Sequence, residues 1–291
     1  MILPGHFCTK ERSIRHLGPT PKQMSASLFA MLAALLYLAA TGLHVLHIFQ
    51  RRQHITRSVA LTSCLALLCH GVVAVLSVSG HAGGLSLGFY TISALMFLAI
   101  NLVCALLTVR RPLQNLLVIL FPLSAMSVLV STFAPETAAI TTELPGGLLL
   151  HIGSSIFAYA LLTLAAAQAA LVAALDYQLR HRHTRGIVQI LPPLQLMEKM
   201  LFELLLAGVV LLTVAIISGF IFVDDIFAQS LVHKTTLTLV AWVLFTLLLW
   251  GHYKLGWRSQ TAVRLTLAGF LALMLAFFGS KLVLELVLHR G

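Results

Sequence analysis

An all-α polytopic membrane protein with about eight transmembrane helices is the fold class that this sequence predicts. Of its 291 residues, 59% are hydrophobic and only 10% are charged, whereas soluble globular domains carry about 25% charged residues. The apolar residues gather in runs long enough to cross a hydrocarbon core of about 30 Å. Basic residues gather in alternate loops between the runs, a pattern that sets the orientation of membrane proteins.

Eight apolar runs follow one another and leave no room for a soluble domain. They cover residues 25–49, 58–79, 87–109, 114–133, 147–177, 203–223, 234–253 and 261–287. The fifth and the eighth are long, and we expect them to tilt or to project from the bilayer. Pro192 and Pro193 break any helix before the sixth run. The apolar residues after them recur at helical spacing, which predicts a short interfacial helix leading into that span.

The loops between the runs alternate in charge. Those after the first, third, fifth and seventh runs are basic, as in "QRRQHITR" and "LRHRHTRG", and the others are poor in base, as in "APETAAITTELPGG". The positive-inside rule places the basic set in the cytoplasm, so eight spans leave both termini outside. The formal net charge of +10 is explained by these loops, and we expect no nucleic-acid partner.

Residues 1–23 do not fit this orientation, because they are basic and would lie outside. They contain no apolar run of their own and are therefore not a secretory signal. We interpret them as an N-terminal extension that precedes a native start at Met24. Residues 24–291 then form a single transmembrane helical domain.

Several classes of chemistry are disfavoured by the motifs. The four cysteines form no Cys-x-x-Cys pair, which argues against a disulfide oxidoreductase and against covalent haem attachment. The chain has no Gly-x-Ser-x-Gly, no phosphate-binding loop and no His-Glu-x-x-His, which are signatures of soluble enzymes. We therefore expect that the protein is not an enzyme.

Thirteen histidines are the unusual feature of the composition, since imidazole binds transition metals and haem iron. His70, in "CLALLCHGVVAV", falls within the hydrocarbon, where an ionisable side chain marks either a functional site or a hydrogen bond to a neighbouring helix. His44 and His47 share one helix face, with His44 a turn deeper. His233 and His252 stand at the two mouths of the seventh span.

Two further groups lie toward the outer side. His151 opens "HIGSSIFAYALL", whose small residues let another helix or a flat ligand approach closely. Lys281 and Glu285 are four residues apart on one face of the last span. They form either a mutual ion pair or a site where Lys281 meets an anionic group such as a propionate.

Four stretches together carry a resemblance to a known family. They are "LLHIGSSIFAYALL", "LPPLQLMEKMLFELLLAGVVLLTVAIISG", "HKTTLTLVAWVLFTLLLWGHYKLGWRSQTAVRLTLAGF" and "FFGSKLVLELVLH". Their order resembles the cytochrome c assembly family of haem-handling membrane proteins, which includes CcsA, CcmC and HemX. The family-like core covers residues 147–289. The stretch around His70 is most similar to the YpjD/HemX-type branch.

The resemblance implies haem b as cofactor, with His151 as an outer-face iron ligand, His289 as a second one and His252 as a ligand at the inner end. His70 matches a ligand position of the narrower branch. Apolar helix faces would cover the porphyrin, and Lys281 would meet its propionates. His44 completes the candidates for cofactor binding. Which histidines pair across helices stays open.

One departure from the family bears on function. Its haem-presenting members carry a tryptophan-rich motif before the seventh span, whereas this chain reads "FVDDIFAQSLVH" without any tryptophan. We expect a haem-binding or haem-handling protein of the bacterial inner membrane that assists cytochrome c maturation or haem supply. Its partners would be haem and cytochrome c biogenesis proteins or apocytochrome. The alternatives are a membrane adaptor or regulator of the same fold without haem, and a small-solute transporter that uses His70.

Overall fold

The computed structural model describes residues 21–50, 53–79, 85–108, 114–134, 140–141, 145–182, 188, 191–222 and 232–279. Within these residues, eight helices are long and apolar enough to cross a membrane. This confirms the predicted fold class. Some of the predictions fall outside the described residues. They concern the candidate site residues His289, Lys281 and Glu285, and most of the predicted N-terminal extension.

The helices follow the predicted runs closely. Their bounds are α1 (Pro21–Gln50), α2 (Gln53–Val78), α3 (Phe89–Thr108), α4 (Gln114–Phe133), α5 (Gly146–Arg180), α7 (Leu194–Phe222), α8 (Val232–Leu255) and α9 (Ser259–Met274), which continues into the π-helical turn η1 (Leu275–Gly279). Two short strands that the sequence did not predict, β1 (Leu85–Ser86) and β2 (Ile140–Thr141), pair antiparallel. They join the connection before α3 to the connection before α5.

The helix of the sixth span begins directly after the two prolines, as predicted. The carbonyl of Pro193 accepts hydrogen bonds from the backbone N–H groups of Leu196 and Met197, at 3.0 and 3.2 Å, and so closes the first turn. From Leu194 to Phe222 the helix is continuous. The predicted interfacial segment and the sixth span are therefore one helix, because no breaker follows Pro193.

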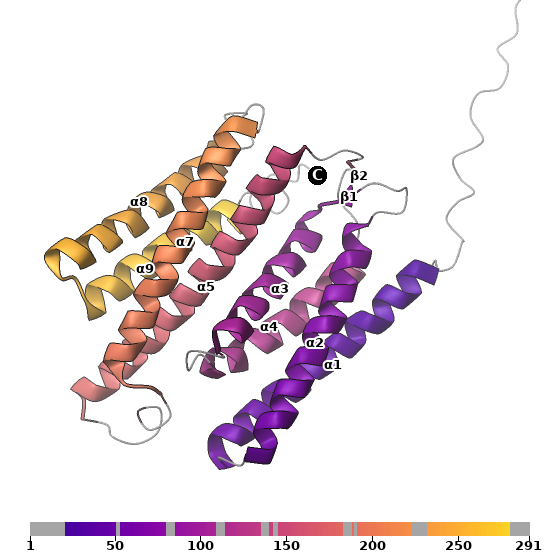
Figure 1. Ribbon diagram of the computed structural model, residues 1–291, viewed down its shortest axis with the longest axis horizontal. Helices are drawn as coiled ribbons and strands as arrows, with labels where there is room; N and C mark the ends of the chain where they lie inside the picture. The colour runs from indigo at the N-terminus through magenta and orange to yellow at the C-terminus, as the bar shows by residue number, and fades with distance from the viewer. Residues whose placement is uncertain are drawn as a thin grey trace, which may run out of the picture.

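The helices form two groups that lie side by side (Figure 1). α1–α4 pack together and form the N-terminal half, while α5, α7, α8 and α9 form the C-terminal half, and α3 packs against α5 where the halves meet. Successive helices run in opposite directions, so the helix ends that flank the basic loops gather at one end of the molecule and those that flank the base-poor loops at the other. We call these the inner and outer ends, following the predicted orientation.

Small side chains allow close packing within the C-terminal half. α5 and α7 pack along much of their length, and the alanines Ala158, Ala160 and Ala165 of α5 are fully buried. A Cβ on Gly208 of α7 would lie 2.8 Å from the Leu162 side chain, so a larger residue there would displace Leu162. Packing of this kind associates helices in lipid, where apolar burial alone provides little driving force.

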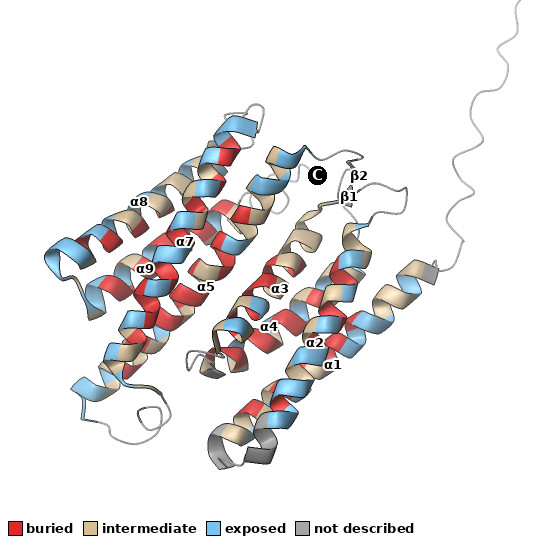
Figure 2. Ribbon diagram, viewed as in Figure 1, coloured by how far each residue is buried: buried red, intermediate tan, exposed pale blue. Residues whose placement is uncertain are grey.

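The outward faces of the helices carry large apolar side chains. Figure 2 shows buried residues along the helix faces that meet inside each half and exposed residues on the faces that point away. The exposed set includes Leu35, Leu61 and Val75. In a bilayer these side chains contact lipid tails, which are as apolar as leucine.

Candidate functional site

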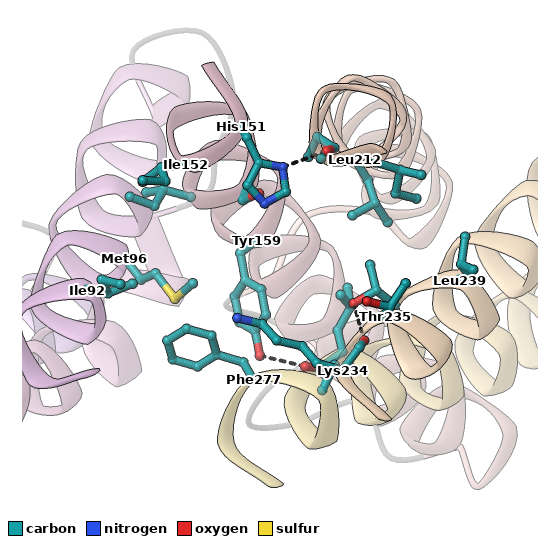
Figure 3. A pocket seen from close by; sticks show the side chains of 18 of the residues that line it. Ile92, Met96, His151, Ile152, Tyr159, Leu212, Lys234, Thr235, Leu239 and Phe277 are labelled. Carbon is teal, nitrogen blue, oxygen red and sulfur yellow. Dashed lines mark hydrogen bonds between the residues drawn. The ribbon is translucent and has the colours of Figure 1, made fainter. Parts of the chain in front are cut away.

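A cavity of about 250 Å³ lies at the outer end, where the two halves meet. Its walls come from α3, α5, α7, α8, α9 and η1 (Figure 3). On α5, residues His151, Ser155 and Tyr159 face it, because residues four apart share one face of a helix. Most of the remaining lining residues are aliphatic or aromatic, and the polar ones among them are Lys234, Thr235 and Thr238. We call this the outer cavity.

His151, predicted from the sequence, has a fixed orientation in this cavity. Its Nδ1 lies 2.7 Å from the carbonyl oxygen of Ala215 on α7. A carbonyl only accepts hydrogen bonds, so Nδ1 carries the proton and donates it, which leaves Nε2 with a free lone pair. The hydrogen bond is drawn in Figure 3. A histidine in this state is ready to bind a metal through Nε2.

A glycine on α7 makes room for the same ring. A Cβ on Gly219 would lie 2.9 Å from Cε1 of His151 and 3.0 Å from its Nδ1. Any larger residue at this position would push the imidazole away from Ala215. The sequence signal was present, since this glycine ends "TVAIISG", but its contact with His151 depends on the tertiary packing of α5 and α7.

Tyr159 forms the floor of the outer cavity. Its hydroxyl donates to the carbonyl oxygen of Leu273 on α9, at 3.2 Å, and its ring lies 5.7 Å from the ring of Phe277 in η1. The tyrosine is buried. It therefore ties α5 to α9 on the side of the cavity that lies toward the middle of the bilayer.

Lys234 lines the outer cavity although its place in the sequence does not single it out. It lies in the first turn of α8 and lines the cavity. Figure 3 shows its side chain reaching toward Tyr159 and Phe277, and its Nζ lies 5.8 Å from the centre of the Phe277 ring. Among the described lining residues it is the only lysine or arginine. The prediction gave the corresponding role to Lys281 instead.

His70 lies in the N-terminal half, away from this cavity. It is fully buried, and its Nδ1 is hydrogen bonded to the hydroxyl of Tyr37 on α1, at 3.0 Å. The hydrogen bond to a neighbouring helix, which was one of the two interpretations of His70, is therefore present. Its Nε2 is buried as well. His44 is also buried, and its ring lies 5.7 Å from that of Phe121, which packs on Tyr37 as well.

His252 lies at the inner end of α8, at the opposite end of the C-terminal half from His151. Its Nδ1 donates to the carbonyl oxygen of Trp257, at 2.9 Å, and its ring stacks on Phe202 with centroids 3.5 Å apart. Gly256, with φ of +69°, lets the chain turn after α8. The turn is closed by the N–H of Trp257, which donates to the carbonyl of Gly251 in the way that glycine commonly ends helices.

The predicted ligands do not form one cluster. The structure places His151 in the outer cavity, His252 at the inner end, and His44 with His70 in the N-terminal half. No group of three or more His, Cys, Asp or Glu side chains that could hold a metal ion occurs among the described residues. What the outer cavity offers is one oriented imidazole, one cation and largely apolar walls that also carry hydroxyl groups.

These features define a polytopic membrane protein with a largely apolar ligand cavity at its outer end. The chain belongs to the family of cytochrome c assembly proteins, whose model matches residues 27–288. It is 33% identical over 261 residues to inner membrane protein YpjD of Escherichia coli (strain K12), a match that covers 89% of this chain and 98% of that protein. YpjD of Escherichia coli O157:H7 is similar to the same extent.

A shorter similarity extends to another bacterium. Over 141 residues, 48% of this chain, it is 31% identical to an uncharacterized 28.8 kDa protein of Azospirillum brasilense, of which the match covers 52%. No solved structure matches at a significant level. The predicted family is confirmed, and so is the prediction of a multi-pass protein of the inner membrane.

Proposed function

We propose that the protein binds haem b in the outer cavity and handles it during cytochrome c maturation or haem supply, as a binding and assembly factor rather than an enzyme. The observation that carries the proposal is the orientation of His151. Its Nδ1–H is held by the carbonyl of Ala215, and Nε2 is free for iron. Membership of the cytochrome c assembly family supports the choice of ligand.

The residues present fit this cofactor. Imidazole is a common axial ligand of haem iron, and a ligating histidine usually donates its other N–H to a carbonyl or carboxylate, which raises its basicity. The apolar side chains of the outer cavity would cover the macrocycle. Lys234, on the outer side, would pair with the propionates through charge-assisted hydrogen bonds. The bound group would supply the iron centre, while the protein orients it and excludes water.

We propose His252 as a second haem contact, at the inner end. Here too a backbone carbonyl, that of Trp257, holds Nδ1, so that Nε2 is free. Phe202 fixes the plane of the ring by stacking. His252 does not line the outer cavity, so the two proposed haem contacts are separate.

A spectrum of the purified protein tests the outer site. We expect a Soret band in mild detergent after haem loading. We expect that His151→Gly removes or shifts this band, because the iron loses its axial nitrogen, and that added imidazole restores it. His233→Gly is the matched control, since His233 is exposed at the same end and does not line the cavity. No Soret band in the wild-type protein would contradict the proposal.

A membrane adaptor or regulator without haem is the second candidate. The observation that favours it is the loop "FVDDIFAQSLVH", which lacks tryptophan. If this candidate is right, His151→Gly leaves cytochrome c maturation in cells unchanged, and the purified protein shows no Soret band. Substitutions in the basic loops would then impair cytochrome c maturation instead.

A further inference from the structure

A second cavity, of about 350 Å³, lies deeper in the membrane. It is bounded by α3 and α4 from the N-terminal half and by α5, α9 and η1 from the C-terminal half. We call it the deep cavity. Apart from the hydroxyls of Ser93, Thr163 and Tyr159, the residues that line it are apolar. Met96 and Tyr159 line both cavities, so the two spaces are neighbours that share a wall.

The shared wall is aromatic and includes the π-helical turn. The neighbouring residues Phe277 and Phe278 of η1 contribute to different cavities, Phe277 to the outer one and Phe278 to the deep one. Phe89 of α3 packs on both rings, with centroid distances of 5.5 and 5.6 Å. π-Helical turns are rare and are frequent at functional sites. This one places a side chain in each cavity from consecutive positions.

The deep cavity reaches the lipid-facing surface. Three residues that line it, Ile119 and Leu123 of α4 and Leu267 of α9, are also 57%, 44% and 40% exposed. They lie inside membrane-spanning helices, so the surface that they expose faces lipid rather than water. The rim of this opening is therefore formed by α4 on one side and α9 on the other.

We propose that the deep cavity is a lateral entrance through which haem passes from the bilayer into the outer cavity. This inference rests on the proposed function of the outer cavity. The route begins at the apolar rim in the hydrocarbon, passes Met96 and Tyr159, and ends near His151 and Lys234. The lining of this route is apolar at the rim and carries a lysine near its end. Haem matches both parts, because its macrocycle is apolar and its propionates are anionic.

The charge of the outer cavity is what selects this occupant over a lipid tail. An acyl or isoprenoid chain would fill the apolar deep cavity alone and would gain nothing from an oriented imidazole. Haem gains from both ends of the route, because its macrocycle fits apolar walls and its propionates meet Lys234. Met96 is the flexible part of the wall, since methionine has three rotatable bonds and adapts to irregular spaces.

If haem enters through the deep cavity, filling the rim of that cavity should slow haem loading and leave the final amount of bound haem unchanged. We reconstitute the full chain in phosphatidylcholine vesicles, mix them with haem-loaded vesicles and follow the Soret band with time. We expect Leu123→Trp to slow loading by about tenfold, equivalent to ~1.4 kcal/mol on the activation barrier, because the indole fills the rim. The final amplitude and position of the band stay those of the wild-type protein, because the outer cavity is unchanged.

Met126→Trp is the matched control for this experiment. Met126 lies one turn further along α4, is exposed to lipid and does not line the deep cavity, so its loading rate should equal that of the wild type. Leu267→Trp, on the opposite rim, should slow loading as Leu123→Trp does, and it replaces that variant if Leu123→Trp does not fold. Equal rates for the rim variants and Met126→Trp would overturn the entrance. A wild-type protein that takes up no haem would instead overturn the proposed function.

Discussion

At the scale of single residues, two positions on the neighbouring helix α7 determine the orientation of the His151 imidazole. The carbonyl of Ala215 fixes its tautomer, and the missing side chain of Gly219 leaves space for the ring. Both come from α7, one turn apart. Orientation of the ring is thus a property of the α5–α7 packing and not of any side-chain partner.

Gly219→Ala therefore should weaken haem binding without touching the ligand itself. The added Cβ would lie 2.9 Å from Cε1 of His151, so the ring must move away from Ala215. Overpacking of this kind costs about 1–3 kcal/mol, and we expect haem affinity to fall by about tenfold or more, measured by titration of the purified protein. Gly153→Ala is the control, because nothing lies within 4 Å of the Cβ that it adds. Equal affinities of the two variants would contradict this role of Gly219.

Lys234 gives a second prediction at this scale. We expect Lys234→Gln to reduce haem affinity by roughly tenfold or more, because a hydrogen bond to a charged partner contributes about 1.5–3 kcal/mol. Haem dimethyl ester lacks the anionic propionates, so its affinity should be the same for the wild type and the variant. Lys254→Gln, at the exposed inner end of α8, should change neither affinity. A loss of ester binding in Lys234→Gln would indicate a disturbed cavity instead of a lost ion pair.

At the scale of elements, the apolar runs and the two prolines were sufficient to predict the helices. Each run becomes one helix, and α7 begins at Leu194 because Pro192 and Pro193 end whatever precedes it. The strands β1 and β2 were not predicted, since two residues carry no periodic pattern. Nor was the π-helical turn η1, whose aromatic residues are positioned by contacts with Phe89 of α3. Contacts of this kind, between helices far apart in the sequence, cannot be predicted from the local spacing of residues.

The turn between α8 and α9 allows a test at this scale. Gly256 has φ of +69°, a conformation that disfavours every side chain. We expect Gly256→Ala to lower the free energy of unfolding by roughly 1 kcal/mol, because the left-handed backbone becomes strained. Thermal unfolding followed by tryptophan fluorescence measures the change, since Trp257 lies in the same turn.

The control for that test is a glycine in a regular helix. Gly42 of α1 has nothing within 4 Å of an added Cβ, and alanine is a better helix former than glycine by about 1 kcal/mol. Gly42→Ala should therefore leave the unfolding temperature unchanged or raise it. A stability of Gly256→Ala at or above that of Gly42→Ala would show that the turn does not depend on glycine.

At the scale of the whole molecule, the candidate site was predictable only in part. His151 could be selected because it stands beside small residues near the end of an apolar run and because it matches the family. Lys234 could not, since its position in the cavity depends on how α8 packs against η1. His44 and His70 were selected as well, yet they lie in a different half, because burial and depth in the membrane do not specify which helices meet.

The outer cavity is assembled from residues that are far apart along the chain, from Ile92 in α3 to Phe277 in η1, and this has a consequence for biosynthesis. Membrane helices enter the bilayer in order as the ribosome delivers them. His151 is inserted with the fifth span, but the lining residues Leu273, Ala276 and Phe277 arrive only with the eighth. A nascent chain therefore carries the imidazole without a compartment around it, and the compartment closes only when the last helix has been inserted.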